Sequence, residues 1–309
     1  MPAAAPTSAA LAVLTLVASA AALAWTGVPP LAAAQTLGEV RPTPSGCAVE
    51  VWLIGSTLVV GGLVACVYLL PAWLMRVVRR LAHPSVLFCA STDAPVCALT
   101  IDDAPSASTS LLLDILREHQ VRATFFIISG NIAGREDVVR QIVDEGHALG
   151  NHLTEDRPSI LDDLHVFEAK LQECEAAINK FQPVATASSP SNERAKIPGE
   201  SERLLAADGG AGATKWMRPA SGWFTAPMRK IAESHGYRIC LGSVYPHDAQ
   251  IRSETLNSLY LRSRTRSGSV IIVHDRSWTV GVLRTALPEL ARKFTFVSLD
   301  DLAARHQEE

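Results

Sequence analysis

Apolar and polar positions divide this chain into two parts. The first 75 residues hold two long uncharged runs, over residues 10–25 and 51–75, whereas from residue 86 onward short apolar runs alternate with amphipathic stretches. The short runs predict β-strands, and apolar residues recurring every three or four positions predict helices between them. Strands that alternate with helices are typical of an α/β fold, so we expect such a domain over residues 86–309.

The expected strands cover residues 96–101, 123–128, 237–241, 270–273 and 294–297. The clearest helix spans residues 160–181, where the apolar positions are four and three residues apart and form one buried stripe. Shorter helices are expected over residues 109–119, 135–145, 226–235 and 280–293. Residues 183–214 are rich in Ala, Ser, Gly and charged residues without periodicity, which predicts a flexible surface insertion.

The second uncharged run, residues 51–75, predicts a transmembrane helix, because a bilayer core requires roughly 20 apolar residues. The N-terminal segment, residues 1–50, contains the first run and has two interpretations: a signal peptide or a first membrane helix. We therefore expect a membrane protein with one or two passes. Arg76, Arg79 and Arg80 favour a cytosolic domain by the positive-inside rule, whereas enzymes on polysaccharides are more often outside, so the side stays open.

Composition narrows the possible partners. The net charge of −3 provides no basic field, so nucleic acid is not an expected partner. The six cysteines show no CxxC spacing, which argues against both a zinc finger and a disulfide framework. Nothing in the composition specifies an oligomeric state.

Two adjacent carboxylates follow the first expected strand, in the string ALTIDDAPS. Neighbouring strand residues point to opposite faces, so Asp102 and Asp103 can take part in one site only if the chain leaves regular strand geometry there. The Ala104-Pro105 pair that follows indicates such a break. One carboxylate can then bind a metal ion while the other acts as a base. The alternative is a pair of solvated acids in a turn.

A second group of polar residues lies in the string GHALGNHLTEDRPS. His152 precedes Asp156 by four residues, and on a helical turn these positions share a face. With Asp103 they would supply three protein ligands and leave one position open for water, as catalytic zinc sites do. The alternative is a structural histidine and an unrelated acid.

Two further residues carry candidate chemistry. Arg218 precedes a turn with Pro and Gly, and its planar guanidinium suits the holding of an ionised carboxylate. His274 ends a strongly apolar strand, where a titrating imidazole would reach the rim of an α/β scaffold. The alternatives are a surface salt bridge for the arginine and a backbone-bonded histidine at the strand end.

Together and in this order, these segments resemble the polysaccharide deacetylase family of carbohydrate esterases, also called the NodB-homology domain. TIDDAP is similar to the family's TFDDGP, GHALGNHLTED to GHEIGNHTxxH, RPASGW to RPPYG, and VIIVHD to a final strand that ends in Leu-x-His; RATFFI resembles the second strand. The likeness covers residues 96–302 except the expected insertion. It implies a distorted (β/α) barrel and a chitin-deacetylase-like enzyme.

The resemblance also implies an activity and a role for each motif residue. The activity is metal-dependent hydrolysis of N-acetyl groups on chitin or a related N-acetylglucosamine polymer. The implied roles are Asp102 as general base, His274 as general acid, Arg218 as the residue that positions Asp102, Asp248 of GSVYPHD as the partner of His274, and Asp103, His152 and Asp156 as metal ligands.

The chain departs from the family pattern at the third metal ligand, where Asp156 replaces a second histidine. A carboxylate favours oxygen-preferring ions. We expect zinc first, with manganese, cobalt and magnesium as alternatives. Leu153 also replaces the usual Ser or Thr, and Ala220 and Ser221 replace Pro-Tyr in the arginine motif.

Two other functions stay open. One is a metal-dependent amidase acting on a small non-peptide C–N substrate. The other is a catalytically inactive carbohydrate-binding or scaffold protein. The joint presence of a base, metal ligands and an acid argues against the inactive protein, because a binding module needs none of them in one place.

Overall fold

The computed structural model describes residues 54–63, 72–182 and 214–306, and it divides the chain into two compact units, residues 1–82 and 83–309. In the first unit, residues 54–63 are helical and α3 spans Ala72–Leu81. Across the three described ranges, no helix is both long and apolar enough to cross a bilayer. The expected segments at 1–50 and 51–75 lie wholly or partly outside these ranges, and so does the expected insertion at 183–214 except Thr214.

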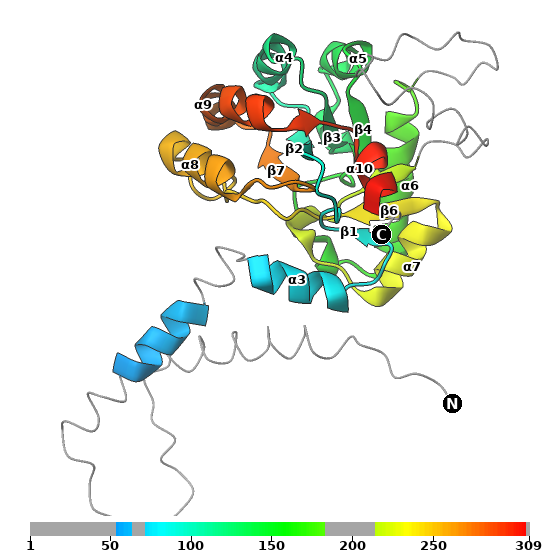
Figure 1. Ribbon diagram of the computed structural model, residues 1–309. Coiled ribbons are helices and arrows are strands. Elements are labelled where there is room, and N and C mark those ends of the chain that lie inside the picture. The colour runs from blue at the N-terminus through cyan, green and yellow to red at the C-terminus, as the bar shows by residue number, and fades with distance from the viewer. Residues whose placement is uncertain (1–53, 64–71, 183–213, 307–309) are drawn as a thin grey trace, which may run out of the picture. The chain divides into compact units, whose positions relative to one another are not determined.

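The second unit is built on a sheet of eight parallel strands (Figure 1). The order is β1-β6-β5-β4-β3-β2-β7, and β8 pairs with β2 beside this path. The strands are β1 (Val86–Leu87), β2 (Val96–Ala104), β3 (Ala123–Ile127), β4 (Ala148–Asn151), β5 (Lys215–Met217), β6 (Tyr237–Cys240), β7 (Val270–His274) and β8 (Thr295–Phe296). The expected strands all occur, with ends that differ by up to three residues.

The two edges of this sheet approach one another. Val244, beyond the end of β6, forms an isolated parallel bridge with Ile271 of β7. The backbone N–H of Ile272 donates to the Val244 carbonyl at 2.9 Å, and that of Ser243 donates to the Val270 carbonyl at 3.0 Å. The sheet therefore curls into an incomplete barrel, which agrees with the expected α/β class.

Helices cover the outside of the strands, and Figure 1 shows α4 beside α5 and α8 beside α9. The helices are α4 (Thr109–Glu118), α5 (Glu136–Asp144), α6 (Leu164–Ile178), α7 (Ala226–Ser234), α8 (Glu254–Arg264), α9 (Ser277–Lys293) and α10 (Leu299–His306), with short turns η1 (Ser129–Asn131), η2 (Ser159–Leu161) and η4 (Ala220–Gly222). The expected helix over residues 160–181 was wrong at its start. Asp162 and Asp163 are extended, so α6 begins only at Leu164.

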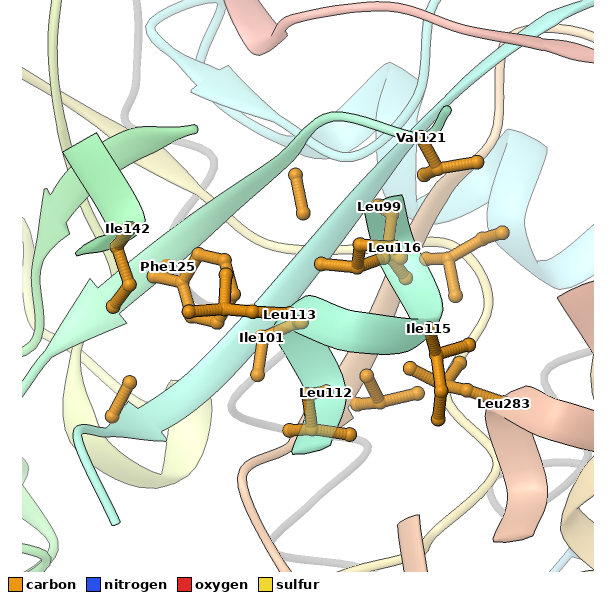
Figure 2. Packing of buried hydrophobic residues seen from close by; sticks show 14 of the residues in the cluster. Leu99, Ile101, Leu112, Leu113, Ile115, Leu116, Val121, Phe125, Ile142 and Leu283 are labelled. Atoms are coloured by element: carbon orange, nitrogen blue, oxygen red, sulfur yellow. The ribbon is translucent and has the colours of Figure 1, made fainter. Parts of the chain in front are cut away.

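The core explains why β2 and β3 read as continuous apolar runs. Every residue of both strands is buried, as expected for parallel strands covered on both faces. Leu99 and Ile101 of β2 pack with Leu113 of α4 and Phe125 of β3 in one apolar cluster (Figure 2). Alternation turns Val96 and Ala98 of β2 to the opposite face, inside the curled sheet. That inner face leads to the polar residues at the strand ends.

Candidate functional site

The site residues follow the carboxyl ends of five parallel strands. Asp102 and Asp103 lie at the end of β2, His152 directly follows β4, Arg218 directly follows β5, Asp248 lies in the loop after β6, and His274 ends β7. Because all paired strands run in the same direction, these ends meet at one edge of the sheet, where α/β proteins carry their chemistry. The structure therefore gathers residues that lie up to 172 positions apart in the sequence.

Arg218 is the centre of a buried polar cluster. Its guanidinium donates to the carboxylate of Asp102, to Thr100 Oγ1 at 2.9 Å and to the carbonyl of Cys240 at 2.9 Å. Its Cζ atom also lies 4.2 Å from the centre of the Phe126 ring. With only 3% of its side chain exposed, the arginine is fixed on every side and holds Asp102 in one orientation.

His274 is held by Asp248, which is fully buried. One carboxylate oxygen of Asp248 accepts from the His274 backbone N–H at 2.8 Å, and the other lies 2.9 Å from Nδ1 of the ring. Thr279 Oγ1 donates to the same carboxylate at 3.0 Å. Burial lowers the pKa of His274, but the hydrogen bond and charge of Asp248 and the charges of Asp102 and Asp103 outweigh burial and raise it. The environment of the imidazole therefore favours its protonated form more than water does.

Asp103 stands at an irregularity in the strand. Its φ of +65° lies in the left-handed region, and the pairing of β2 with β3 shifts register between Ile101 and Ala104. The expected break in strand geometry is therefore present, although it lies inside β2 rather than after it. Burial raises the pKa of Asp103, but the interaction with His152 and the charges of His274 and Arg276 lower it to about 2.

His152 faces Asp103 with a defined ring nitrogen. Its Nδ1 lies 2.6 Å from the carbonyl oxygen of Arg218, which can only accept, so Nδ1 carries the proton. Nε2 lies 3.5 Å from Asp103 Oδ1, so its lone pair and the carboxylate face one another. Two ligands of a tetrahedral zinc ion are roughly 3.4 Å apart, so this pair fits a metal ion as well as a proton. Burial lowers the pKa of His152, but Asp102 and Asp103 raise it above its usual value.

Asp156 does not join this pair. The helical turn expected for residues 152–156 was wrong, because Leu153 has a φ of +66° and residues 152–158 form bends rather than a helix. The Asp156 side chain is 63% exposed and lies 3.2 Å from the guanidinium of Arg276, which is also 2.6 Å from Asp103 Oδ2. The described residues contain no group of three His, Cys, Asp or Glu side chains arranged to hold a metal ion. Two of the three expected ligands thus fit an ion together, and the third is bound to an arginine.

With this geometry established, the chain can be compared with known proteins. Residues 90–240 match the family model described as polysaccharide deacetylase. Residues 90–240 therefore form a domain of the polysaccharide deacetylase family. A peptidoglycan-N-acetylglucosamine deacetylase of Bacillus cereus is 27% identical over 221 residues, which are 67% of this chain and 87% of that protein. The resemblance expected from the motifs is confirmed.

Solved structures support the fold of this domain. The crystal structure of a peptidoglycan N-acetylglucosamine deacetylase superposes with a TM-score of 0.58 at 24% identity and covers 71% of this chain and 92% of the other. A CE4 family pseudoenzyme from Bacillus anthracis gives a TM-score of 0.58 at 19% identity and covers 73% and 71%. At these identities, the likeness concerns the fold alone.

Two residues of the site, Arg276 and Asp275, were not identified from the sequence. Arg276 was not considered, although it lies only two positions after His274 in the string VHDRSW. Asp275, between them, is buried and accepts hydrogen bonds from Ser106 and Thr109, so it ties the end of β7 to the start of α4. Burial raises the pKa of Asp275 above its usual value. A basic residue two positions after a strand-terminal histidine was the available signal for Arg276.

Proposed function

We propose that this chain is a metal-dependent hydrolase that removes N-acetyl groups from a polymer of N-acetylglucosamine, such as chitin or the glycan of peptidoglycan. The observation that carries the proposal is the pairing of Asp102 with Arg218 beside His274 with Asp248, at the carboxyl edge of one sheet. A fixed carboxylate and a raised-pKa imidazole in one place are the base and acid that amide hydrolysis requires.

Asp102 acts as the general base in this proposal. Arg218 orients the carboxylate through a charged hydrogen bond in a buried setting. The carboxylate removes a proton from water as the water oxygen forms a bond to the acetamide carbon. Because Arg218 is itself fixed by Thr100 and the Cys240 carbonyl, Asp102 needs no reorganisation for this step.

His274 acts as the general acid. Asp248 fixes the ring through Nδ1, which leaves Nε2 to donate its proton to the amide nitrogen as the C–N bond breaks. The products are acetate and a free amino sugar. Since the amine is a poor leaving group without protonation, the raised pKa of His274 matches the demands of the step.

A divalent ion fits beside these two residues. We propose zinc, with manganese, cobalt and magnesium as alternatives, held by Asp103 and His152 and, after rearrangement, by Asp156. When bound, such an ion polarises the acetamide carbonyl and lowers the pKa of a bound water molecule. The 3.5 Å separation of Asp103 Oδ1 and His152 Nε2 supports two of these three ligands.

The experiment is acetate release from an N-acetylglucosamine oligomer, with zinc content measured on the same sample. We expect release by the wild-type chain and a loss of about 100-fold or more in Asp102→Asn, with zinc content unchanged. Turnover in Asp102→Asn equal to the wild type contradicts the role of this residue. Activity on small cyclic amides without activity on the oligomer would favour an amidase instead.

A second candidate function is that of an inactive carbohydrate-binding or scaffold protein. The specific observation in its favour is that Arg276, rather than a metal ion, joins Asp103 to Asp156. Oligomer binding with neither zinc uptake nor acetate release would support this candidate and contradict the hydrolase.

Membrane attachment is a separate proposal. We propose that the uncharged run over residues 51–75 anchors the catalytic domain, because its length matches the thickness of a bilayer core. Retention of the full chain in carbonate-washed membranes, with release of a chain that begins at residue 83, is the expected result. Protease protection of the domain in sealed vesicles then shows on which side of the membrane the domain lies.

A further inference from the structure

Arg276 occupies the space between two carboxylates that were expected to share a metal ion. One guanidinium nitrogen lies 2.6 Å from Asp103 Oδ2 and 3.2 Å from Asp156 Oδ2. The Asp103 side chain is 3% exposed, whereas the Asp156 side chain is 63% exposed. The arginine therefore joins an acid fixed inside the site to an acid on a surface loop, and it does so with a single positive charge.

The backbone of Arg276 is fixed, but its side chain has room to move. The Arg276 N–H donates to the His274 carbonyl at 2.8 Å, and its own carbonyl accepts from Thr279 N–H at 3.1 Å at the start of α9. The side chain is 28% exposed, in contrast with 3% for Arg218, which is enclosed on every side. A change of side-chain torsion can thus withdraw the guanidinium into solvent without disturbing β7 or α9.

A divalent ion at Asp103 Oδ1 and His152 Nε2 would compete with this guanidinium, which holds Asp103 through Oδ2. Both are cations that require Asp103, and Asp156 reaches the site only through the arginine. Two positive charges near 4 Å repel by several kcal/mol in a partly buried setting. Binding of the ion must therefore be coupled to departure of the arginine.

We propose that Arg276 is a built-in competitor of the metal ion. In the metal-free protein its guanidinium neutralises Asp103 and Asp156, and it withdraws when the ion binds, which frees Asp156 to become the third ligand. This inference rests on the metal-dependent function proposed above. Its consequence is a site of weakened affinity, so that loading depends on the concentration of available metal.

The test is a calorimetric titration of the full-length, metal-free chain with zinc chloride at fixed pH and ionic strength. We compare the wild type with Arg276→Ala, with Arg276→Lys, which keeps the charge, and with Arg140→Ala, a surface arginine of α5. We expect the Kd for zinc to fall about tenfold or more in Arg276→Ala, the scale typical of residues beside metal ligands. Arg276→Lys and Arg140→Ala should stay near the wild-type value.

Asp156 supplies the matched second variant. In the Asp156→Asn background, Arg276→Ala should give a smaller gain in zinc affinity, because only the competition for Asp103 is then relieved. Thermal unfolding adds a readout that checks folding: without metal, Arg276→Ala should lower Tm, and with zinc it should raise Tm above that of the loaded wild type.

The outcomes separate this inference from the proposed function. The inference is overturned if Arg276→Ala binds zinc no more tightly than the wild type. It is also overturned if Arg276→Ala raises zinc affinity as much in the Asp156→Asn background as in the wild type. Failure of both the wild type and Arg276→Ala to bind zinc overturns it as well. If the affinities change as expected but the zinc-loaded wild type releases no acetate, the inference holds and the proposed hydrolase fails. If acetate is released but the affinities are unchanged, the hydrolase holds and the inference fails.

Discussion

Asp102 and His274 are register partners on adjacent parallel strands, β2 and β7. Paired residues of neighbouring strands point to the same face and lie about 4.8 Å apart along the hydrogen-bonding direction. The proposed base and acid are therefore placed by the sheet itself rather than by loops. Their supports come from other strand ends, Arg218 after β5 and Asp248 after β6. Changes to either support should act on one proposed catalytic residue at a time.

Replacing Arg218 by methionine should unfold the domain at lower temperature. The substitution leaves the Asp102 carboxylate buried without its partner, a change that typically costs about 3–5 kcal/mol. For a domain of this size, the expected decrease in Tm is on the order of 10 °C. Adding Asp102→Asn to Arg218→Met should recover part of this loss, because the uncompensated charge is then removed. A double variant less stable than Arg218→Met would contradict a charge-pair explanation.

Asp248→Asn should shift the pH dependence of activity. The hydrogen bond and charge of Asp248 raise the pKa of His274, so their loss makes the imidazole give up its proton at lower pH. The alkaline limb of kcat/KM against pH should therefore move to lower pH. A lower rate with an unchanged profile would mean that Asp248 only orients the ring.

The same pair predicts a pH dependence of stability. Because the folded-state pKa of His274 is raised, its ion pair with Asp248 is fully present below the unfolded pKa of about 6.5. It is lost as pH rises through the folded pKa. The Tm difference between wild type and Asp248→Asn should therefore be largest near pH 5 and shrink toward pH 9. Asp248→Glu serves as the charge-preserving control.

The sequence was sufficient to predict the strands whose residues are all buried. β2 and β3 are buried throughout, so their apolar composition identified them, and the break at Asp103 followed from two adjacent acids before Ala-Pro. α8 escaped prediction because two of its three buried residues are polar, Asn257 and Ser258, which leaves no apolar stripe. Periodicity reports helices only when packing is apolar.

The site was harder to predict where a backbone torsion angle or the length of a side chain determines whether a residue joins it. Spacing alone placed His152 and Asp156 on a helical turn, but the left-handed φ of Leu153 turns the chain away, and no pattern of residue types reveals a torsion angle. Arg276 reaches the site because its side chain is long, from the N-cap position of α9, which begins three residues before the expected helix over residues 280–293. Both cases depend on contacts between distant segments.

Gly150→Ala should disturb the site indirectly, through Phe126 and Arg218. Gly150 of β4 is the register partner of Phe126 on β3, and an added Cβ would lie 2.6 Å from two ring atoms of Phe126. The displaced ring would press on Arg218, which packs on its face. We expect a loss of about 1–3 kcal/mol in stability and a lower kcat. Phe126→Leu in the same chain should restore stability if the clash is the cause, whereas no recovery would point to backbone strain.

Gln120→Gly should stabilise the domain without touching the site. Gln120 follows the C-cap of α4 with a φ of +53°, its N–H donates to the Arg117 carbonyl, and the N–H of Val121 donates to the Leu116 carbonyl. This is the hydrogen-bond pattern of a Schellman motif, whose left-handed residue is usually glycine. Glycine avoids a steric cost of roughly 1 kcal/mol that alanine retains. We therefore expect the free energy of unfolding, measured in urea, to be higher for Gln120→Gly than for Gln120→Ala by about that amount. Both variants should release acetate equally. Equal stability of the two variants would show that the left-handed turn carries no measurable strain in solution.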